Sequence, residues 1–249
     1  MTTTVVTKRS WLYTLGTGGK FALLGLAALL TLGPVVWTLI TALSPTDSVT
    51  QEVNVGFGAF ADVFTKIPIW LYAWNSALVV LLVAAGQMLS AAMAGYVFAK
   101  FEFRHKKLMF ALILATMMVP LQVTIVPVFM LVRGMGLADT LLALIVPALP
   151  TAFGTFLMRQ YFMGIPTELG EAAQLDGAGP WRTFFGVYLP LATPGLAIVG
   201  ILAFNYHWNE FFRPLIMTIS DQNFTLPLGL VTLQAVSYTH LTLPTIYSV

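Results

Sequence analysis

This sequence has few charged residues and no cysteine. Only 9% of its 249 residues are charged, and it contains no cysteine. A typical soluble domain carries about 25% charged residues, so an ordinary soluble domain is excluded. The missing cysteine excludes a disulfide framework and thiol chemistry. The three histidines, His105, His207 and His240, lie too far apart in the sequence to indicate a metal site.

Motifs of catalysis and nucleotide binding are also missing. The sequence contains neither an HExxH motif nor a Ser-His-Asp pattern. Residues 16–20 (GTGGK) faintly resemble a phosphate loop, but they lack a Gly at the required spacing and a Ser or Thr after Lys20. We therefore expect no catalytic residue, no metal and no cofactor bound by this chain. Its net charge of +2 requires no nucleic-acid partner.

Apolar residues make up most of the sequence. Hydrophobic residues make up 58% of the chain, and the mean hydropathy is +0.85. Runs without charge that reach about 20 residues can cross roughly 30 Å of hydrocarbon as helices. Such runs are continuous here, which favours helices over the alternating pattern of a barrel. The runs are 21–43, 71–99, 108–132, 140–158 and 191–208. We predict an all-α fold, a polytopic membrane helical bundle with five spans.

The distribution of Lys and Arg predicts the orientation. With the N-terminus in the cytoplasm, nine of the twelve basic residues fall inside and three fall outside, as the positive-inside rule requires. The first run is longer than the apolar core of a signal peptide, about 7–15 residues, so we expect it to be retained. The predicted outer loops are 44–70 and 133–139, and the predicted inner loops are 100–107 and 159–190.

Prolines and a buried amide mark the third run. Pro120 and Pro127 should bend it, because proline frees carbonyl groups in a helix. Gln122 and Thr124 lie between the two prolines. Bent spans with polar side chains often line a pathway. The alternative is that proline is simply more common in membrane helices.

Polar side chains gather where the fifth run ends. Asn205, Trp208 and Asn209 are spaced to share one helix face, and Glu210 and Arg213 are spaced to form an ion pair. Polar groups in a span tend to face water or the bundle interior. One interpretation is that these residues form a water-exposed wall of a translocation path. The other is that they form an aromatic belt with a polar helix end. The candidate pathway residues are Gln122, Asn205, Trp208, Asn209 and Glu210.

The inner loop 159–190 is unusually polar for this chain. Pro166 and Glu168 predict a helix start, and Gly177 predicts a left-handed helix end. Pro180 should begin a second short helix, and Leu189-Pro190 should return the chain to the membrane. The first helix presents one stripe of Leu169, Ala172, Ala173 and Asp176. This geometry suits a knob that docks into a partner, although an ordinary connecting helix pair would look similar.

The spacing in this loop resembles a known family. Glu171-Ala172-Ala173, three residues, Gly177, nine residues, Val187, one residue and Leu189-Pro190 resemble the EAA loop of binding-protein-dependent ABC importer permeases, which usually have Ile at the position of Val187. The resemblance extends over about 21–234. In particular, the sequence looks like the second permease subunit of carbohydrate importers of the maltose/glycerol-phosphate type, which residues 208–211 (WNEF) and 225–230 (TLPLGL) also resemble.

That resemblance implies a role, partners and a location. The chain would be a multi-pass protein of the bacterial inner membrane that forms the pathway for a sugar, polyol or sugar phosphate. It would not be an enzyme, because ATP and Mg²⁺ would bind to a separate cytoplasmic ATPase dimer. The other implied partners are a homologous permease subunit, an external solute-binding protein and membrane lipid. The implied ATPase-coupling residues are Glu171, Ala172, Ala173, Asp176, Gly177, Val187, Leu189 and Pro190.

The end of the chain departs from that pattern. The family has six spans, whereas residues 235–249 (AVSYTHLTLPTIYSV) are short, partly polar and interrupted by Pro244. We expect a cytoplasmic segment 1–20, a transmembrane permease domain 21–234, and a foreign or non-native tail 235–249 that replaces part of the last span.

Two other classes of protein stay open on the residues alone. A secondary transporter would work without an ATPase and should show inverted repeats and ion-binding carboxylates within its spans. The only charge near a span here is Glu210, at its edge. An intramembrane enzyme would need a catalytic pair at one depth, and the sequence indicates none.

Overall fold

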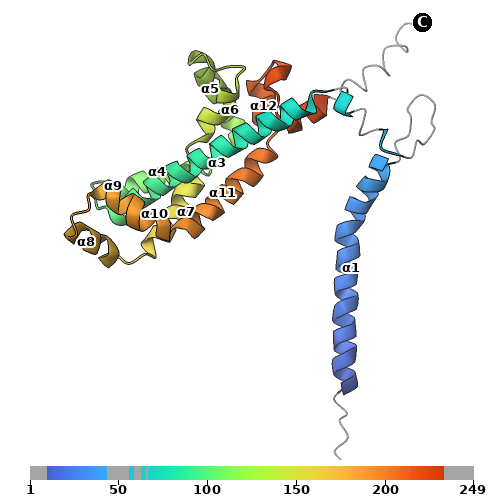
Figure 1. Ribbon diagram of the computed structural model, residues 1–249, viewed down its shortest axis with the longest axis horizontal. Helices are drawn as coiled ribbons and strands as arrows, with labels where there is room; N and C mark the ends of the chain where they lie inside the picture. The colour runs from blue at the N-terminus through green and yellow to red at the C-terminus, as the bar shows by residue number, and fades with distance from the viewer. Residues whose placement is uncertain (1–9, 44–55, 59–62, 66, 233–249) are drawn as a thin grey trace, which may run out of the picture. The chain divides into compact units, whose positions relative to one another are not determined.

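The computed structural model describes residues 10–43, 56–58, 63–65 and 67–232. The chain divides into two units, residues 1–66 and 67–249. All regular elements in the described ranges are helical, which confirms the predicted all-α class (Figure 1). The predicted tail 235–249 lies outside the described residues.

Helix α1, Ser10–Leu43, is the main element of the first unit. Its part Gly18–Leu43 is long and apolar enough to cross a membrane, in agreement with the predicted span 21–43. Within this unit, apolar side chains are exposed around the helix; Leu29 is 73% exposed and Leu30 is 70% exposed. The hydroxyl groups of Thr31 and Thr38 donate to carbonyl groups of the preceding turn. These hydroxyl groups are thus satisfied within the helix, as a lipid environment requires.

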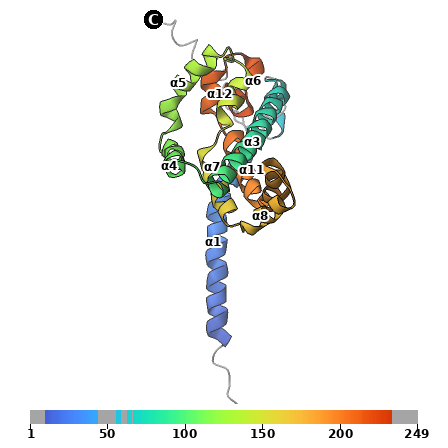
Figure 2. The same cartoon turned by 90° about the vertical axis from the view of Figure 1, so that its left-hand side faces the viewer.

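Helix α3, Ile69–Lys100, is the long axis of the second unit and corresponds to the predicted span 71–99. It lies alongside α7, Ala152–Met163, and α11, Thr193–Trp208 (Figures 1 and 2). One buried cluster joins these helices to the segment that follows the inner loop. Its members include Ala91, Ala92, Tyr96, Met158, Phe162, Phe184 and Tyr188.

The third predicted span is a broken helix. Residues 106–116 form α4, Lys106–Thr116, and residues 121–134 form α5, Leu121–Gly134; the two meet at 101°. Pro120 stands at the break in extended conformation, as the N-cap of α5. A proline has no N–H to donate and disfavours helical backbone at the residue before it, here Val119, so α4 ends before this point. Pro127 lies inside α5 without ending it. The prediction of one bent helix over 108–132 was wrong in degree, since the chain turns through more than a right angle.

The fourth predicted span, 140–158, is a bent pair as well. Helix α6, Leu141–Ile145, and the 3-10 turn η1, Val146–Ala148, meet α7 at 41°. The fifth predicted span, 191–208, corresponds to α11. The segment Pro180–Leu191, which was predicted to lie almost entirely in the inner loop, meets α11 at 75°. By length and composition the described residues hold two straight spans, or five if each bent pair is one span. The count of five agrees with the sequence. Three short elements follow α11: α12, Phe212–Met217, the 3-10 turn η3, Asp221–Asn223, and a helical stretch over residues 226–232.

Asp139 ties the segment after α12 to the start of α6. Its backbone is left-handed, with φ of 57°. Its carboxylate accepts hydrogen bonds from the backbone N–H groups of Ile219 (2.8 Å) and Ser220 (2.9 Å) and from the Ser220 hydroxyl. These donors hold the pKa of the Asp139 carboxyl well below its usual range. The anchor fixes the end of the short helix that carries Arg213.

The contact between α3 and α7 depends on a glycine. A Cβ at Gly95 would lie 2.7 Å from the Cβ of Met158 and 2.8 Å from the backbone nitrogen of Arg159. Small residues at helix contacts let backbones approach closely in membrane proteins. Ala91 and Ala92, on the same helix, are fully buried.

We expect Gly95→Ala to destabilise the second unit by about 1–3 kcal/mol, because the added methyl group meets backbone that cannot move aside. Thermal unfolding of the purified chain in detergent measures this. Gly200→Ala is the matched control, since its Cβ would meet only the flexible end of Met88, 2.8 Å away at the sulfur. Equal losses in the two variants would contradict the proposed backbone contact.

Candidate functional site

The predicted coupling loop contains a short exposed helix. Helix α8 runs Glu168–Leu175, with Thr167 as its N-cap. The predicted start at Pro166 was therefore wrong by two residues, and the proline precedes the helix. Glu168 and Glu171 occupy the first turn, where a negative charge is favourable.

Gly177 ends α8 as predicted. Its φ of +77° is left-handed, a conformation that glycine adopts without strain. The Gly177 N–H donates to the carbonyl of Gln174 (3.0 Å), and the Ala178 N–H donates to that of Ala173 (2.9 Å). This pair of bonds is a Schellman motif, which satisfies carbonyl groups that a helix end leaves free.

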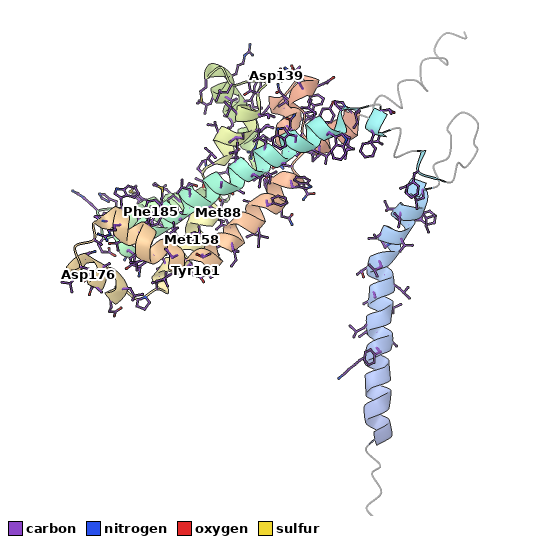
Figure 3. The ribbon with its side chains drawn as sticks, viewed as in Figure 1. Met88, Asp139, Met158, Tyr161, Asp176 and Phe185 are labelled. Atoms are coloured by element: carbon purple, nitrogen blue, oxygen red, sulfur yellow. The ribbon has the colours of Figure 1, made fainter. Side chains whose placement is uncertain are left out.

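The outer surface of α8 is free of other elements in the second unit. Glu171, Ala172 and Asp176 are exposed, and Ala173 is half-buried. Leu175 is 89% exposed, and the sequence analysis did not single it out. An exposed leucine beside small residues and carboxylates gives α8 a surface suited to docking. Figure 3 shows Asp176 and Asp139 at opposite ends of this unit.

Gly170 and Tyr188 connect α8 to the buried cluster. A Cβ at Gly170 would lie 2.4 Å from the Tyr188 hydroxyl oxygen, so the helix rests directly on that side chain. Tyr188 is only 3% exposed, and its ring centroid lies 5.0 Å from that of Tyr96 on α3. The contact between Gly170 and Tyr188 was not predicted from the sequence. A glycine inside so short a helix was the available signal, because it usually has a packing reason.

We expect Gly170→Ala to lower substrate uptake on the order of tenfold. The added methyl group must displace Tyr188, and a cost of about 1.4 kcal/mol in the coupled state corresponds to a tenfold lower rate. Uptake into cells or vesicles that hold the assembled transporter measures it. Gly186→Ala on the same loop is the control, since a Cβ there meets nothing within 4 Å. Normal uptake by Gly170→Ala would show that α8 does not depend on this contact.

The return of the chain toward α11 differs from the prediction. Residues 180–191 form one helical segment composed of α9, Pro180–Thr183, the π-helix η2, Phe184–Tyr188, and α10, Leu189–Leu191. Val187, Leu189 and Pro190 lie within it, and the chain turns at Ala192 instead of at Leu189-Pro190. The Leu189 N–H bonds to the Phe184 carbonyl, five residues back. This wider turn accommodates a proline, which has no N–H of its own.

Four of the five candidate pathway residues line one hollow. Gln122 of α5 and Asn205, Asn209 and Glu210 at the end of α11 surround a space of about 480 Å³. Trp208 lines a neighbouring hollow with Asn205 and Asn209, which confirms that these three share a face. Trp208 also stacks on Phe204, with ring centroids 5.5 Å apart.

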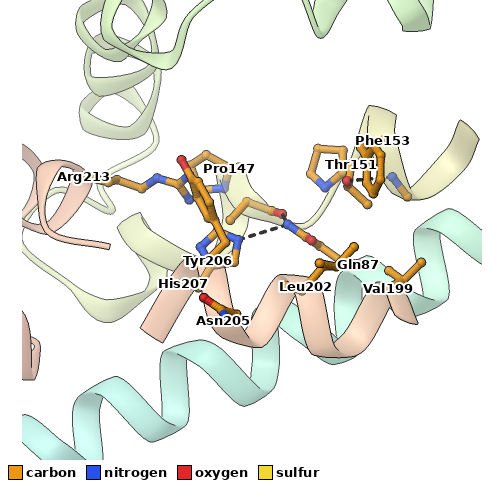
Figure 4. Close-up of a pocket in the computed structure, with 14 residues that line it drawn as sticks. Gln87, Pro147, Thr151, Phe153, Val199, Leu202, Asn205, Tyr206, His207 and Arg213 are labelled. Carbon is orange, nitrogen blue, oxygen red and sulfur yellow. Dashed lines mark hydrogen bonds between the residues drawn. The ribbon is translucent and has the colours of Figure 1, made fainter. Parts of the chain in front are cut away.

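A larger cavity of about 720 Å³ lies on another face of the same helix end (Figure 4). Its walls come from α3, from the segment between α6 and α7, from α11 and from α12. Polar side chains from each part face it together with two aromatic rings. The labelled lining residues include Gln87, Thr151, Phe153, Asn205, Tyr206, His207 and Arg213.

A chain of polar contacts crosses the wall of this cavity. The Gln87 side-chain nitrogen donates to the Ala148 carbonyl (2.7 Å) and lies 3.1 Å from Nε2 of His207. His207 Nδ1 lies 2.8 Å from a Glu210 carboxylate oxygen. Because an amide nitrogen only donates, His207 accepts at Nε2 and donates from Nδ1, which is the neutral tautomer. We call Gln87, His207, Glu210 and Arg213 the polar chain.

Arg213 completes the polar chain. Its Nε lies 3.2 Å from the other Glu210 oxygen, which confirms the predicted ion pair, and its Nη1 donates to the Leu144 carbonyl (3.2 Å). The side chains of both charged residues are about 10% exposed or less. Gln87 and His207 lie 120 residues apart and were not predicted as site residues from the sequence. In the described part of the chain, no group of three His, Asp or Glu residues could hold a metal ion.

Comparison with known proteins identifies the family. The sequence profile of the family described as binding-protein-dependent transport system inner membrane component matches residues 88–246. The chain belongs to this family. The match includes the whole inner loop 159–190, three of the four residues of the polar chain (His207, Glu210 and Arg213) and part of the segment 235–249. It does not support the alternatives of a secondary transporter or an intramembrane enzyme.

Curated relatives of this permease are similar over most of its length. It is 32% identical over 213 residues to the lactose transport system permease protein LacG of Rhizobium radiobacter, which covers 84% of this chain and 78% of LacG. It is also 32% identical over 233 residues to the arabinooligosaccharides transport system permease protein AraQ of Halalkalibacterium halodurans, 90% of this chain and 81% of AraQ.

A solved structure shares the fold of this permease. The crystal structure of a bacterial ABC transporter involved in the import of the acidic polysaccharide alginate contains a chain that matches with a TM-score of 0.76. The match covers 99% of this chain and 90% of the other, at 24% sequence identity. The helical architecture of the permease is therefore that of an ABC transporter chain.

Proposed function

We propose that this permease imports neutral saccharides and is driven by a separate ATPase that docks on α8. One observation carries the substrate class. In the described structure, Arg213 is the only Lys or Arg that lines the cavity of about 720 Å³, and no Lys or Arg lines the hollow of about 480 Å³. Glu210 neutralises Arg213. The relatives named for lactose and arabinooligosaccharides support the same class.

The lining suits sugar hydroxyl groups. Asn205 and Tyr206 are exposed on the helix end, where they can donate and accept hydrogen bonds. Tyr206 and Phe153 offer aromatic faces for the apolar C–H surface of a sugar ring. The lining offers no unpaired cation to an anionic solute, so a sugar phosphate fits less well than a neutral sugar.

The coupling end supports the ATP-driven part of the proposal. In this arrangement the N-terminus and α8 are cytoplasmic, and the surface of Glu171, Ala172, Ala173 and Asp176 fits a cleft of an ATPase dimer that holds ATP and Mg²⁺. Gly177, Val187, Leu189 and Pro190 set the path of the chain behind that surface. The remaining partners are a homologous permease subunit and an external solute-binding protein. Support comes from the exposed surface of α8 and from the family.

Reconstitution of the whole importer tests this function. The chain is assembled in proteoliposomes with the permease, ATPase and binding protein encoded beside it, and uptake of labelled neutral oligosaccharides and of glycerol phosphate is compared with and without internal ATP. We expect ATP-dependent uptake of the neutral sugar, reduced in Asn205→Ala and unchanged in Ile198→Ala, an exposed position outside the hollows. Uptake driven by an ion gradient without the ATPase, or preference for glycerol phosphate, would refute the proposal.

A further inference from the structure

A basic pocket lies at the end of the second unit where α3 ends and α4 begins. It has a volume of about 640 Å³ and is bounded by the end of α3, the start of α4 and α7. Its lining includes Phe103, His105, Lys106, Lys107, Phe110 and Arg159. None of these residues belongs to the hollows at the end of α11 or to the coupling helix α8.

The positive charge of this pocket is only partly neutralised. Lys106 Nζ binds a Glu102 carboxylate oxygen at 2.8 Å, and the Glu102 side chain is 90% exposed. The hydrogen bond from Lys106, with the charges of Lys106 and Lys107, lowers the pKa of that carboxyl. Among the described residues, no carboxylate lies within ion-pair distance of Lys107 or Arg159.

Arg159 is held in place by contacts that leave its charge available. Its Nε donates to the Phe98 carbonyl (3.1 Å), and its guanidinium carbon lies 4.3 Å from the centre of the Phe110 ring. The two terminal nitrogens of the guanidinium make no hydrogen bond to a described residue. A fixed guanidinium with two free nitrogens matches the oxygens of a phosphate group.

The surface next to the pocket is apolar and uncovered in the described unit. No residue of α4 is buried. Leu108, Met109 and Leu112 of α4 are 58%, 49% and 60% exposed, and Met163 at the end of α7 is 53% exposed. Because α4 starts at the pocket and belongs to a segment apolar enough for a membrane, a basic site and a lipid-facing surface adjoin. Topology alone would require basic residues here but no cavity among them.

We propose that the basic pocket binds the headgroup of an anionic phospholipid, with the acyl chains along the exposed face of α4. Basic pockets between membrane helices are suited to such headgroups, and each nearby Lys or Arg strengthens the attraction. Lys107 and Arg159 contact the phosphate, while Lys106 stays paired with Glu102 at the edge of the pocket. The apolar surface of α4 favours a lipid over free inorganic phosphate, which would leave that surface unused.

Lipid retention by the full chain tests this site. The protein is purified from mixed phosphatidylcholine and phosphatidylglycerol vesicles, and bound phospholipid is counted by native mass spectrometry. We expect retained phosphatidylglycerol, with an affinity lowered on the order of tenfold by Lys107→Gln and further by Lys107→Gln/Arg159→Gln. Lys107 is exposed and makes no hydrogen bond or ion pair to a described side chain, so its variant should fold even if the double variant does not.

The control and the competing source decide the outcome. Arg133→Gln removes an exposed basic residue at the end of α5, outside the pocket, and should retain the lipid. Equal loss in Arg133→Gln and Lys107→Gln would show nonspecific attraction and overturn the site. Thermal stabilisation of the wild-type chain in pure phosphatidylcholine by inorganic phosphate, as strong as that by phosphatidylglycerol, would assign the pocket to free phosphate and overturn the lipid proposal. Equal retention by all variants would also overturn it.

Discussion

Replacing Arg213 with methionine is expected to destabilise the second unit by about 3–5 kcal/mol, because it leaves the buried Glu210 carboxylate without its cation. The Glu210 side chain is 10% exposed, and Arg213 is its only Lys or Arg partner in the described structure. Glu210→Gln should cost less, since the amide can still accept from His207. Thermal or chemical unfolding in detergent measures both changes.

The double variant separates an ion pair from two independent contributions. Glu210→Gln/Arg213→Met removes both charges, so its loss should be smaller than the sum of the single losses. Arg133→Met, at an exposed position, should change stability by about 0.5 kcal/mol or less. Additive losses at Glu210 and Arg213 would mean that the 3.2 Å contact does not couple the two residues.

The same variants bear on selectivity. Glu210→Gln leaves the Arg213 guanidinium at the cavity wall without a balancing carboxylate. We therefore expect an anionic sugar to compete better for uptake in this variant than in the wild-type chain, if the neutral lining sets the substrate class.

The number of spans could be predicted because it depends on local composition. Lipid excludes unpaired charges, so the charge-free runs mark the segments that can enter it. The direction of each segment could not be predicted in the same way. Pro120 and Pro127 look alike in sequence, yet only Pro120 breaks the helix. Packing around each proline decides whether the carbonyl groups that the proline leaves free accept other hydrogen bonds. The sequence alone does not show that packing.

In the coupling loop and in the polar chain, features set by neighbouring residues could be predicted, and contacts between distant residues could not. The end of α8 at Gly177 was predictable, because the end of a helix is determined by the residues next to it. The contact of Gly170 with Tyr188 was not, since it depends on how the π-helix η2 folds back. Likewise, Glu210 and Arg213 are three residues apart and could be paired from their spacing. Gln87 and His207 meet only because α3 packs against α11.

Gly177→Pro is expected to abolish uptake while the chain still inserts into the membrane. Proline fixes φ near −65°, whereas Gly177 has φ of +77°, so the Schellman turn cannot form. The substitution also removes the N–H that donates to the Gln174 carbonyl at 3.0 Å. The surface of α8 would then lose its fixed end, and the ATPase should no longer co-purify with the assembled complex. Uptake in vesicles and recovery of the ATPase on affinity purification are the two measurements.

A graded series shows whether the conformation of Gly177 is the cause. A Cβ at Gly177 would meet nothing within 4 Å, so any loss in Gly177→Ala comes from the left-handed backbone, which costs about 1–2 kcal/mol for a residue with a side chain. Asparagine tolerates this conformation better, so Gly177→Asn should keep more uptake than Gly177→Ala, and Gly177→Pro should keep none. Gly179→Ala is the matched control, because Gly179 has φ of −71° and open space around it. If Gly177→Pro retains uptake and ATPase at the level of Gly179→Ala, α8 is not the coupling element, whatever its resemblance to one.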